Sequence, residues 1–377
     1  MQQVLFRIPI KIPGWTPEGI PIYGFAAMLL SAFVICTWLA NRRAEKEGIR
    51  REWLQDLTVW LFVGGIVGAR LTFLFAEDDP GQPWTTRIAS ALSEFLKIWN
   101  GGLVLYGSII GGIVGYFLAY FLKFRKAGLS SWKLADVLAP SLAVGLCLGR
   151  IGCFLNGCCY GAVACPDCWQ VHFPLSGMPR YSLVRDGYQT AAGFTMSIRS
   201  EDDRTVGAVA AGSPADESGL RSGDIIVKLR EFPIAGEERA VASYRELDNY
   251  LGRDWTRGKN DLALTVRRGN QEKDLPPFAP RTIGLYPTQL YESISMLLVF
   301  LLLSAFWEFR RHPGEVMALL MFCYGVQRYV VEMLRDDPRP VGFEKYISLL
   351  LMIVGPVLFV WLRWLSGTAK GLAKGTA

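Results

Sequence analysis

Charged residues are scarce in this sequence and histidine is almost absent. Asp, Glu, Lys and Arg make up 20% of the 377 residues, against about 25% in ordinary soluble domains. There are 2 histidines. The apolar segments hold neither an HExxH zinc motif nor a GxSG serine motif, which argues against an intramembrane protease. The net charge of +6 comes with basic loops beside apolar segments, so nucleic-acid binding has no separate support.

Apolar residues, at 51% of the chain, are abundant instead. They gather in runs of about 20 residues, the length that spans a bilayer as a helix. The sequence therefore predicts an α-helical polytopic membrane protein with seven transmembrane helices. We expect them at residues 20–40, 54–76, 102–122, 134–154, 287–307, 315–334 and 346–364.

Basic residues mark alternate loops. Arg42 and Arg43 follow the first run, and Lys123 and Arg125 follow the third, whereas the loop after the second run carries acidic residues 77–79. Lys and Arg accumulate on the cytoplasmic side of membrane proteins. We therefore expect the N-terminus outside and the C-terminus in the cytoplasm.

One external connection is far longer than the others, and its composition changes abruptly at residues 187–280. This insert is charged and strand-like at 194–198, 206–209 and 261–268. A serine followed by a proline opens a short helix at Ser213, and a glycine ends it. The order SPAxxSGLxxGDxI, with an amphipathic segment at 243–251, resembles a bacterial PDZ domain. The chain then has three parts, 1–186, 187–280 and 281–377, of which the first and last form the membrane domain.

A PDZ domain binds an extended peptide by strand addition and seats its C-terminal carboxylate on backbone N–H groups. The resemblance places that carboxylate loop at Ala192, Gly193 and Phe194. The same residues are equally compatible with an ordinary loop that enters the first strand. The insert would then be a structural cover without a peptide ligand.

Several charged residues stand in apolar context. Arg150 ends the fourth run within GRIGCFLNGCCYG. An arginine at membrane depth costs about 2.5–3.5 kcal/mol even on lenient scales, so we expect it to face a polar cavity and a polar ligand. Tyr324, Arg328, Glu332 and Arg335 recur at helical spacing along one stripe of the sixth run. The simpler interpretation of that stripe is an internal ion pair between Arg328 and Glu332, and Arg335 could equally be an interfacial anchor.

Two further segments carry polar groups at the ends of apolar runs. Glu292 follows the proline of YPTQLYE, where a helix N-terminus favours a carboxylate in any case. Tyr106 and Gly107 lie in GGLVLYGSIIGG at the start of the third run, and Gly111 and Gly115 continue a spacing that is typical of close helix packing.

Five of these motifs, in this order, resemble the prolipoprotein diacylglyceryl transferase family. They are Ile22-Tyr23-Gly24, GGLVLYGSIIGG, GRIGCFLNGCCYG, YPTQLYE and Tyr324-x3-Arg328-x3-Glu332-x2-Arg335, and they span nearly the whole chain outside the insert. The resemblance implies an enzyme of the bacterial inner membrane. It would transfer the diacylglyceryl group of phosphatidylglycerol to the lipobox cysteine thiol of a prolipoprotein, releasing glycerol phosphate. It implies no metal and no other cofactor.

The resemblance also implies a set of site residues. Arginine offers a planar charged fork that holds a phosphate bidentately, so Arg150 and Arg328 are the expected clamp. Many relatives have a histidine at the position of Tyr106, proposed as the base, which leaves Glu292 or Glu332 as the remaining candidate bases. The predicted catalytic residues are Arg150, Arg328, Tyr106, Glu292 and Glu332, and the predicted substrate-binding residues are Tyr23, Gly107, Arg150, Asn156, Gly161, Tyr324 and Arg335.

A different class of protein is a membrane receptor or scaffold that has lost activity and presents its PDZ-like insert to peptides. Tyr106 favours this alternative, because tyrosine, with a pKa of about 10, is a poor proton acceptor. The joint presence of the arginines and glutamates named above argues against it.

Cysteines form a separate cluster. Five of the eight lie within sixteen positions, at Cys153, Cys158, Cys159, Cys165 and Cys168. An oxidising outer compartment favours disulfides, but four cysteines in reach could also bind zinc, and an odd number leaves at least one thiol unpaired. We expect these cysteines to brace the loop rather than to react.

Overall fold

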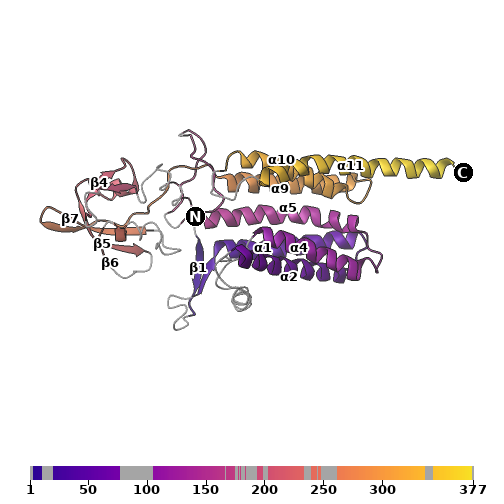
Figure 1. Ribbon diagram of the computed structural model, residues 1–377, viewed down its shortest axis with the longest axis horizontal. Coiled ribbons are helices and arrows are strands. Elements are labelled where there is room, and N and C mark those ends of the chain that lie inside the picture. The colour runs from indigo at the N-terminus through magenta and orange to yellow at the C-terminus, as the bar shows by residue number, and fades with distance from the viewer. Residues whose placement is uncertain are drawn as a thin grey trace. The chain divides into compact units, whose positions relative to one another are not determined.

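The protein is described by a computed structural model (Figure 1). It forms two compact units: Met1–Ala32, Ala143–Val299 and Met321–Val354 make up the first, and Phe33–Leu142, Phe300–Leu320 and Gly355–Ala377 the second. The structure describes residues 3–10, 20–76, 105–165, 167–174, 177, 179, 183, 193–197, 203–232, 239–243, 245–247, 261–335 and 343–375.

Long helices account for the predicted apolar runs. They are α1 (Gly24–Lys46), α2 (Arg51–Ala76), α4 (Leu105–Ala119), α5 (Ser131–Asn156), α9 (Thr288–Phe306), α10 (Glu315–Glu332) and α11 (Phe343–Gly375) (Figure 1). Within the described residues, five helical stretches are long and apolar enough to cross a membrane: Gly24–Lys46, Arg51–Thr72, Ser131–Asn156, Thr288–Phe309 and Lys345–Trp364. A shorter apolar helix covers Ile110–Phe124. The chain is thus a helical, multi-pass membrane protein.

The start of the first predicted span is wrong. Residues Ile20–Tyr23 form strand β2, which pairs antiparallel with β1 (Val4–Ile8), and α1 begins only at Gly24. Proline at position 21 disfavours helical geometry for the residue before it, and β-branched isoleucines suit a strand. The apolar composition of this segment therefore reflects strand pairing.

Helices α2 and α4 of the second unit pack closely through glycines (Figure 1). A Cβ atom on Gly111 would lie inside van der Waals contact with the carbonyl oxygen of Gly64, and one on Gly68 would meet that of Gly107. Small residues allow membrane helices to bring their backbones this close. The predicted packing role of Gly111 is confirmed, and Gly107 takes part in the same contact.

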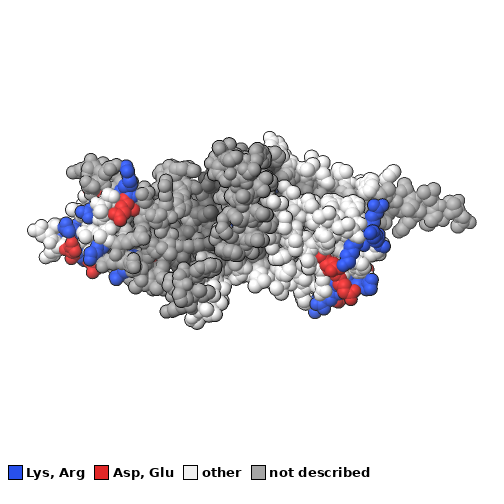
Figure 2. Space-filling model, turned by 60° about the horizontal axis from the view of Figure 1, so that its bottom comes forward, with Lys and Arg blue, Asp and Glu red and all other residues white. Residues whose placement is uncertain are grey.

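The helical surface is largely uncharged. In Figure 2 the described part of the visible helical face is mostly white, while Lys and Arg gather with Asp and Glu at one end of it. Leu30, Ile110 and Leu298 are each more than half exposed, at 66%, 62% and 60%. Apolar exposure on this scale is unfavourable in water and suits a lipid environment.

The insert forms two small antiparallel sheets. Strands β3 (Phe194–Met196) and β4 (Val206–Val209) pair with each other. A four-stranded sheet has the order β6 (Arg239–Ala240), β5 (Ile225–Phe232), β7 (Asp261–Arg268) and β8 (Gln271–Asp274). The predicted strands at 206–209 and 261–268 are confirmed with the same bounds. The one predicted at 194–198 is described as a strand only as far as Met196.

The insert has its own hydrophobic core. Helix α7 (Pro214–Glu217) begins after Ser213, whose hydroxyl accepts a hydrogen bond from the Asp216 N–H at 3.3 Å, as predicted for a helix N-cap. Of the amphipathic segment 243–251, residues 245–247 are helical and the others lie outside the described residues, apart from 243. The core contains Phe194, Val206, Leu220, Ile226, Leu229, Leu262, Leu264 and Val266.

Candidate active site

A chain of buried ion pairs joins three helices of the first unit. Arg150 on α5 places its Nε atom 2.9 Å from Oε2 of Glu292 on α9. The other oxygen of Glu292 lies 3.8 Å from Nη1 of Arg328 on α10. Arg328 reaches Glu332, one turn further on, with Nη2 3.2 Å from Oε2. Glu292 therefore bridges the two arginines that the sequence predicted as a phosphate clamp.

These charges are well removed from solvent. The side chains of Glu292 and Glu332 are 2% and 8% exposed, and those of Arg150 and Arg328 are 13% and 10% exposed. Taking a charge out of water costs several kcal/mol, and a close opposite charge must offset it. Arg335 adds a third positive charge close enough to act on Arg150. Three arginines and two glutamates leave one positive charge in excess, which suits a phosphate anion.

Arg335 does not lie on the helical stripe, which corrects the sequence-based prediction. Helix α10 ends at Glu332, and Arg335 instead forms a β-bridge with Gly161, while the Ala162 N–H donates to the Leu334 carbonyl at 2.9 Å. The pairing of the chain after α5 overrides the helical spacing. It turns the α10 end toward this strand-like segment.

Gly161 holds that segment in place. Its N–H donates to the Tyr286 carbonyl at 3.1 Å. A Cβ atom here would lie 2.7 Å from the Tyr286 oxygen and 2.9 Å from the Leu334 oxygen, so only glycine fits. Gly161 thus ties the start of α9 to the end of α10, beside the helices that carry the ion pairs.

The other predicted substrate-binding residues are distributed over both units. Tyr23 lies half-buried in β2 of the first unit, and the backbone oxygen of Asn156, the last residue of α5, accepts a hydrogen bond from Gln3 Nε2 at 2.9 Å. Tyr324 lies one turn before Arg328 on α10. Tyr106 and Gly107 belong to α4 in the second unit, where only the backbone of Tyr106 is described.

The predicted peptide loop of the insert is described in part. Ala192 lies outside the described residues. Gly193 has a φ of 87°, a conformation that favours glycine, and Phe194 opens β3 with its side chain buried in the insert core.

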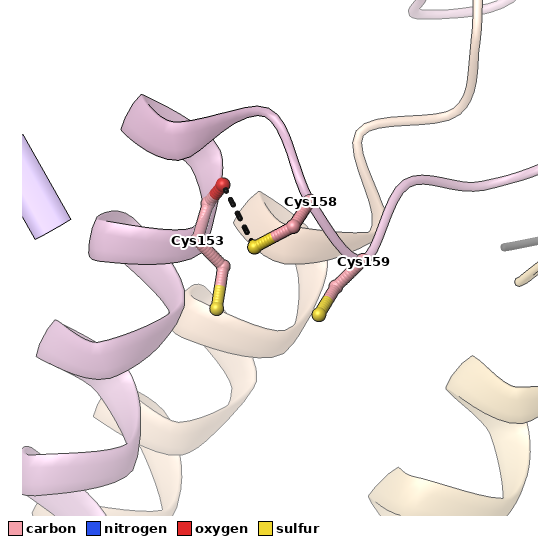
Figure 3. Close-up of side chains that lie close together, drawn as sticks. All are labelled: Cys153, Cys158 and Cys159. Atoms are coloured by element: carbon pink, nitrogen blue, oxygen red, sulfur yellow. Dashed lines mark hydrogen bonds between the residues drawn. The ribbon is translucent and has the colours of Figure 1, made fainter. Parts of the chain in front are cut away.

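A cluster of three thiols lies next to the arginines, among the five cysteines for which the sequence left disulfides, zinc binding and free thiols open. The Sγ atoms of Cys153, Cys158 and Cys159 all lie within 4.8 Å of one another (Figure 3). The Cys158 thiol donates a hydrogen bond to the Cys153 carbonyl oxygen at 3.7 Å (Figure 3). Arg150 and Arg335 lie near enough for their positive charges to act on the Cys159 sulfur.

The remaining pair of clustered cysteines is oxidised. Cys165 and Cys168 form a disulfide, which is one of the outcomes that the sequence left open. The hydroxyl of Tyr286 lies 3.7 Å and 3.6 Å from their sulfur atoms. This small loop thereby contacts the segment that precedes α9.

The helices and the buried arginines define a class: a multi-pass membrane protein with buried and only partly compensated positive charge. Residues 15–361 match the family model described as prolipoprotein diacylglyceryl transferase, and the chain belongs to that family.

Three relatives illustrate the similarity, each named as a phosphatidylglycerol–prolipoprotein diacylglyceryl transferase. The one from Rhodopirellula baltica is 26% identical over 92% of this chain and 73% of its own length. The Clostridium tetani protein is 26% identical over 90% of this chain and 93% of its own. The Bdellovibrio bacteriovorus protein is 28% identical over 95% and 93%.

Proposed function

We propose that this protein transfers the diacylglyceryl group of phosphatidylglycerol to the lipobox cysteine thiol of prolipoproteins. In this reaction the thiol first loses its proton, to water or to one of the candidate bases Glu292 and Glu332. The sulfur attacks the glycerol carbon of the diacylglyceryl group, the carbon–oxygen bond to phosphate breaks, and glycerol phosphate leaves with the electron pair. Membership of the family and the names of the relatives support this assignment. The structural observation that carries it is the ion-pair chain in which Glu292 joins Arg150 to Arg328.

The ion-pair chain suggests a division of roles. Arg150 and Arg328 would hold the phosphate and stabilise the charge that develops on it as the carbon–oxygen bond breaks. Glu292 would keep both guanidinium groups in place until the lipid arrives, and Glu332 would orient Arg328. Tyr106 is proposed to contact the phosphate or the thiol. Tyr23, Gly107, Asn156, Gly161, Tyr324 and Arg335 are proposed to surround the lipid head group.

For the membrane topology, we propose seven spans, formed by α1, α2, α4, α5, α9, α10 and α11, with the N-terminus outside a bacterial inner membrane. Support comes from the second unit, where basic residues of alternate loops meet acidic ones at helix ends. Arg310, after α9, pairs with Glu47, after α1, and Lys123 pairs with Asp56. Arg363 of α11 lies 3.2 Å from Glu315 at the start of α10. These groups would lie at the cytoplasmic face.

The insert, residues 187–280, is proposed to be a PDZ-like domain on the outer face that positions prolipoproteins or a later processing partner. Its strand order, its separate core and the positive φ of Gly193 support this. A chain lacking residues 190–280 should process prolipoproteins more slowly in cells, with the defect differing between substrates. Unchanged rates for every substrate would contradict the accessory role.

A reconstituted assay tests the transfer itself. Purified protein in phosphatidylglycerol vesicles should convert a lipobox peptide to its diacylglyceryl thioether, detected by mass spectrometry. The matched peptide with serine in place of cysteine, and vesicles of zwitterionic phosphatidylcholine alone, should give no product. An inactive receptor would give no thioether with any of these combinations, so that result would favour the scaffold alternative.

A further inference from the structure

Cys153, Cys158 and Cys159 converge on one point through the way that α5 ends. Gly157 has a φ of 75°. The Cys158 N–H donates to the Cys153 carbonyl at 3.1 Å, and the Gly157 N–H donates to that of Phe154 at 3.3 Å. This pattern is a Schellman cap, which brings the side chains at the positions of Cys153 and Cys158 into contact.

The third thiol joins the first two because of an unusual backbone conformation. Cys159 has a φ of 60°, which is uncommon for a residue other than glycine and costs about 1–3 kcal/mol. Consecutive side chains in extended backbone point to opposite sides. The left-handed conformation of Cys159 instead lets its sulfur approach the same space as that of Cys158 (Figure 3).

The first turn of α9 fixes the two loop cysteines in this arrangement. The buried Thr288 hydroxyl donates to the Cys159 carbonyl at 2.8 Å, and Nε2 of the buried Gln289 donates to the Cys158 carbonyl at 2.7 Å. The backbone of both cysteines is therefore held by a rigid element, and that of Cys158 by the cap as well. Such support of the surrounding groups is what a preorganised ligand set requires.

We infer that Cys153, Cys158 and Cys159 bind one zinc-class metal ion as thiolates, leaving its fourth position open to the thiol that accepts the diacylglyceryl group. Zinc–sulfur bonds of about 2.3 Å in a tetrahedron put the sulfurs about 3.8 Å apart. The observed spacing of at most 4.8 Å needs only small side-chain adjustments to reach this value. Three protein ligands and one open position is the arrangement of catalytic zinc sites.

The surroundings suit a cation bound to thiolates. The site lies at the C-terminal end of α5, where the helix dipole favours positive charge. The positive charges of Arg150 and Arg335 act on the Cys159 sulfur and would stabilise the negative charge of three thiolates around a divalent ion. The same two arginines belong to the anion site described above, so a thiol bound to the metal would lie beside the phosphate.

This inference rests on the proposed transferase function, and it supplies the thiolate that the reaction needs. A free cysteine thiol has a pKa of about 8.5 and is mostly protonated at neutral pH, whereas a thiol that coordinates zinc is deprotonated. The bound acceptor sulfur would attack the glycerol carbon, forming the carbon–sulfur bond as the bond to phosphate oxygen breaks. Its proton would already have left to water when the metal was bound.

The test measures metal in the full-length protein, purified in detergent without chelators. Elemental analysis should find about one zinc per chain. Cys153→Ser or Cys159→Ser should lower the zinc content at least tenfold, while Cys323→Ser, a change of a half-buried cysteine on α10, should leave it unchanged. After exchange with Co²⁺, a lipobox peptide should shift the sulfur-to-cobalt absorption bands, and the serine peptide should not.

Several results would overturn the inference. The first is a zinc content of the wild type that is as low as that of the Cys159→Ser variant. The second is a disulfide between two of the three cysteines in place of metal. The third is that no thiol peptide shifts the cobalt absorption bands. The wild-type measurement does not depend on any variant folding. If transfer proceeds at full rate in protein stripped of metal, the inference fails while the transferase function stands. If the metal and the thiol response are present but no transfer occurs, the proposed function fails instead.

Discussion

Replacing Arg150 by alanine is expected to lower the rate of diacylglyceryl transfer about 10²–10³-fold, the effect of removing one donor to a developing oxyanion. The side chain of Arg150 is only 13% exposed, and electrostatic interactions are stronger in such surroundings than in water. The variant should remain folded, because Glu292 keeps its contact with Arg328. The measurement is thioether formation with phosphatidylglycerol vesicles and a lipobox peptide.

Two further variants make the Arg150 experiment specific. Arg150→Lys keeps the charge but loses the planar fork, so it should recover only part of the rate. Arg125→Ala removes an exposed arginine between the third and fourth apolar runs and should leave the rate unchanged. A loss of less than threefold in Arg150→Ala, or an equal loss in Arg125→Ala, would show that Arg150 does not hold the phosphate.

The sequence predicts which charged residues meet in the membrane, because each buried charge needs a partner of opposite charge. A buried charge without one is too unfavourable to persist. This reasoning identifies Arg150, Arg328 and Glu332, and it predicts the pair within α10 from its helical spacing. Glu292 is identified only by the family resemblance, because a helix N-terminus alone would explain it. The sequence does not predict that Glu292 bridges both arginines. That contact depends on how α5, α9 and α10 are rotated against one another, which no local pattern encodes.

Other features were missed because tertiary pairing decides them. Ile20–Tyr23 is apolar enough for a span, but its pairing with Val4–Ile8 makes it a strand. Arg335 has the spacing of a helical residue, but the bridge with Gly161 ends the pattern. Each segment pairs with residues outside its own local sequence window, Ile20–Tyr23 with a neighbouring strand and Arg335 with the distant Gly161. The helix and strand periods of the segments themselves therefore gave the wrong conformation.

The thiol cluster is a different case, because part of its signal is local. A cysteine three residues before Asn156, the last residue of α5, and another just after the capping Gly157 occupy the two positions that a Schellman cap brings together. That much could have been predicted from the spacing of Cys153 and Cys158. The positive φ of Cys159 could not, since nothing in the sequence marks this residue for a left-handed conformation.

The largest loss of stability is expected from Glu292→Gln. This change keeps the shape of the side chain but removes the carboxylate charge between the guanidinium groups of Arg150 and Arg328. Of the ion pairs described above, the one between Arg328 and Glu332 then remains. Removing one member of a buried charge pair typically costs about 3–5 kcal/mol. Glu332→Gln should cost less, because Glu332 joins only one of the two arginines. Denaturant unfolding of both variants in detergent measures the difference.

Phosphatidylglycerol should separate a structural role of Glu292 from its role beside the anion site. A ligand that binds only the folded state stabilises it according to its concentration and affinity. With the glutamate gone, the lipid phosphate becomes the main negative charge between the arginines, so phosphatidylglycerol should raise the stability of Glu292→Gln more than that of the wild type. Phosphatidylcholine, which is zwitterionic, should do so much less. Equal stabilisation of both proteins by the two lipids would mean that the phosphate does not enter this site.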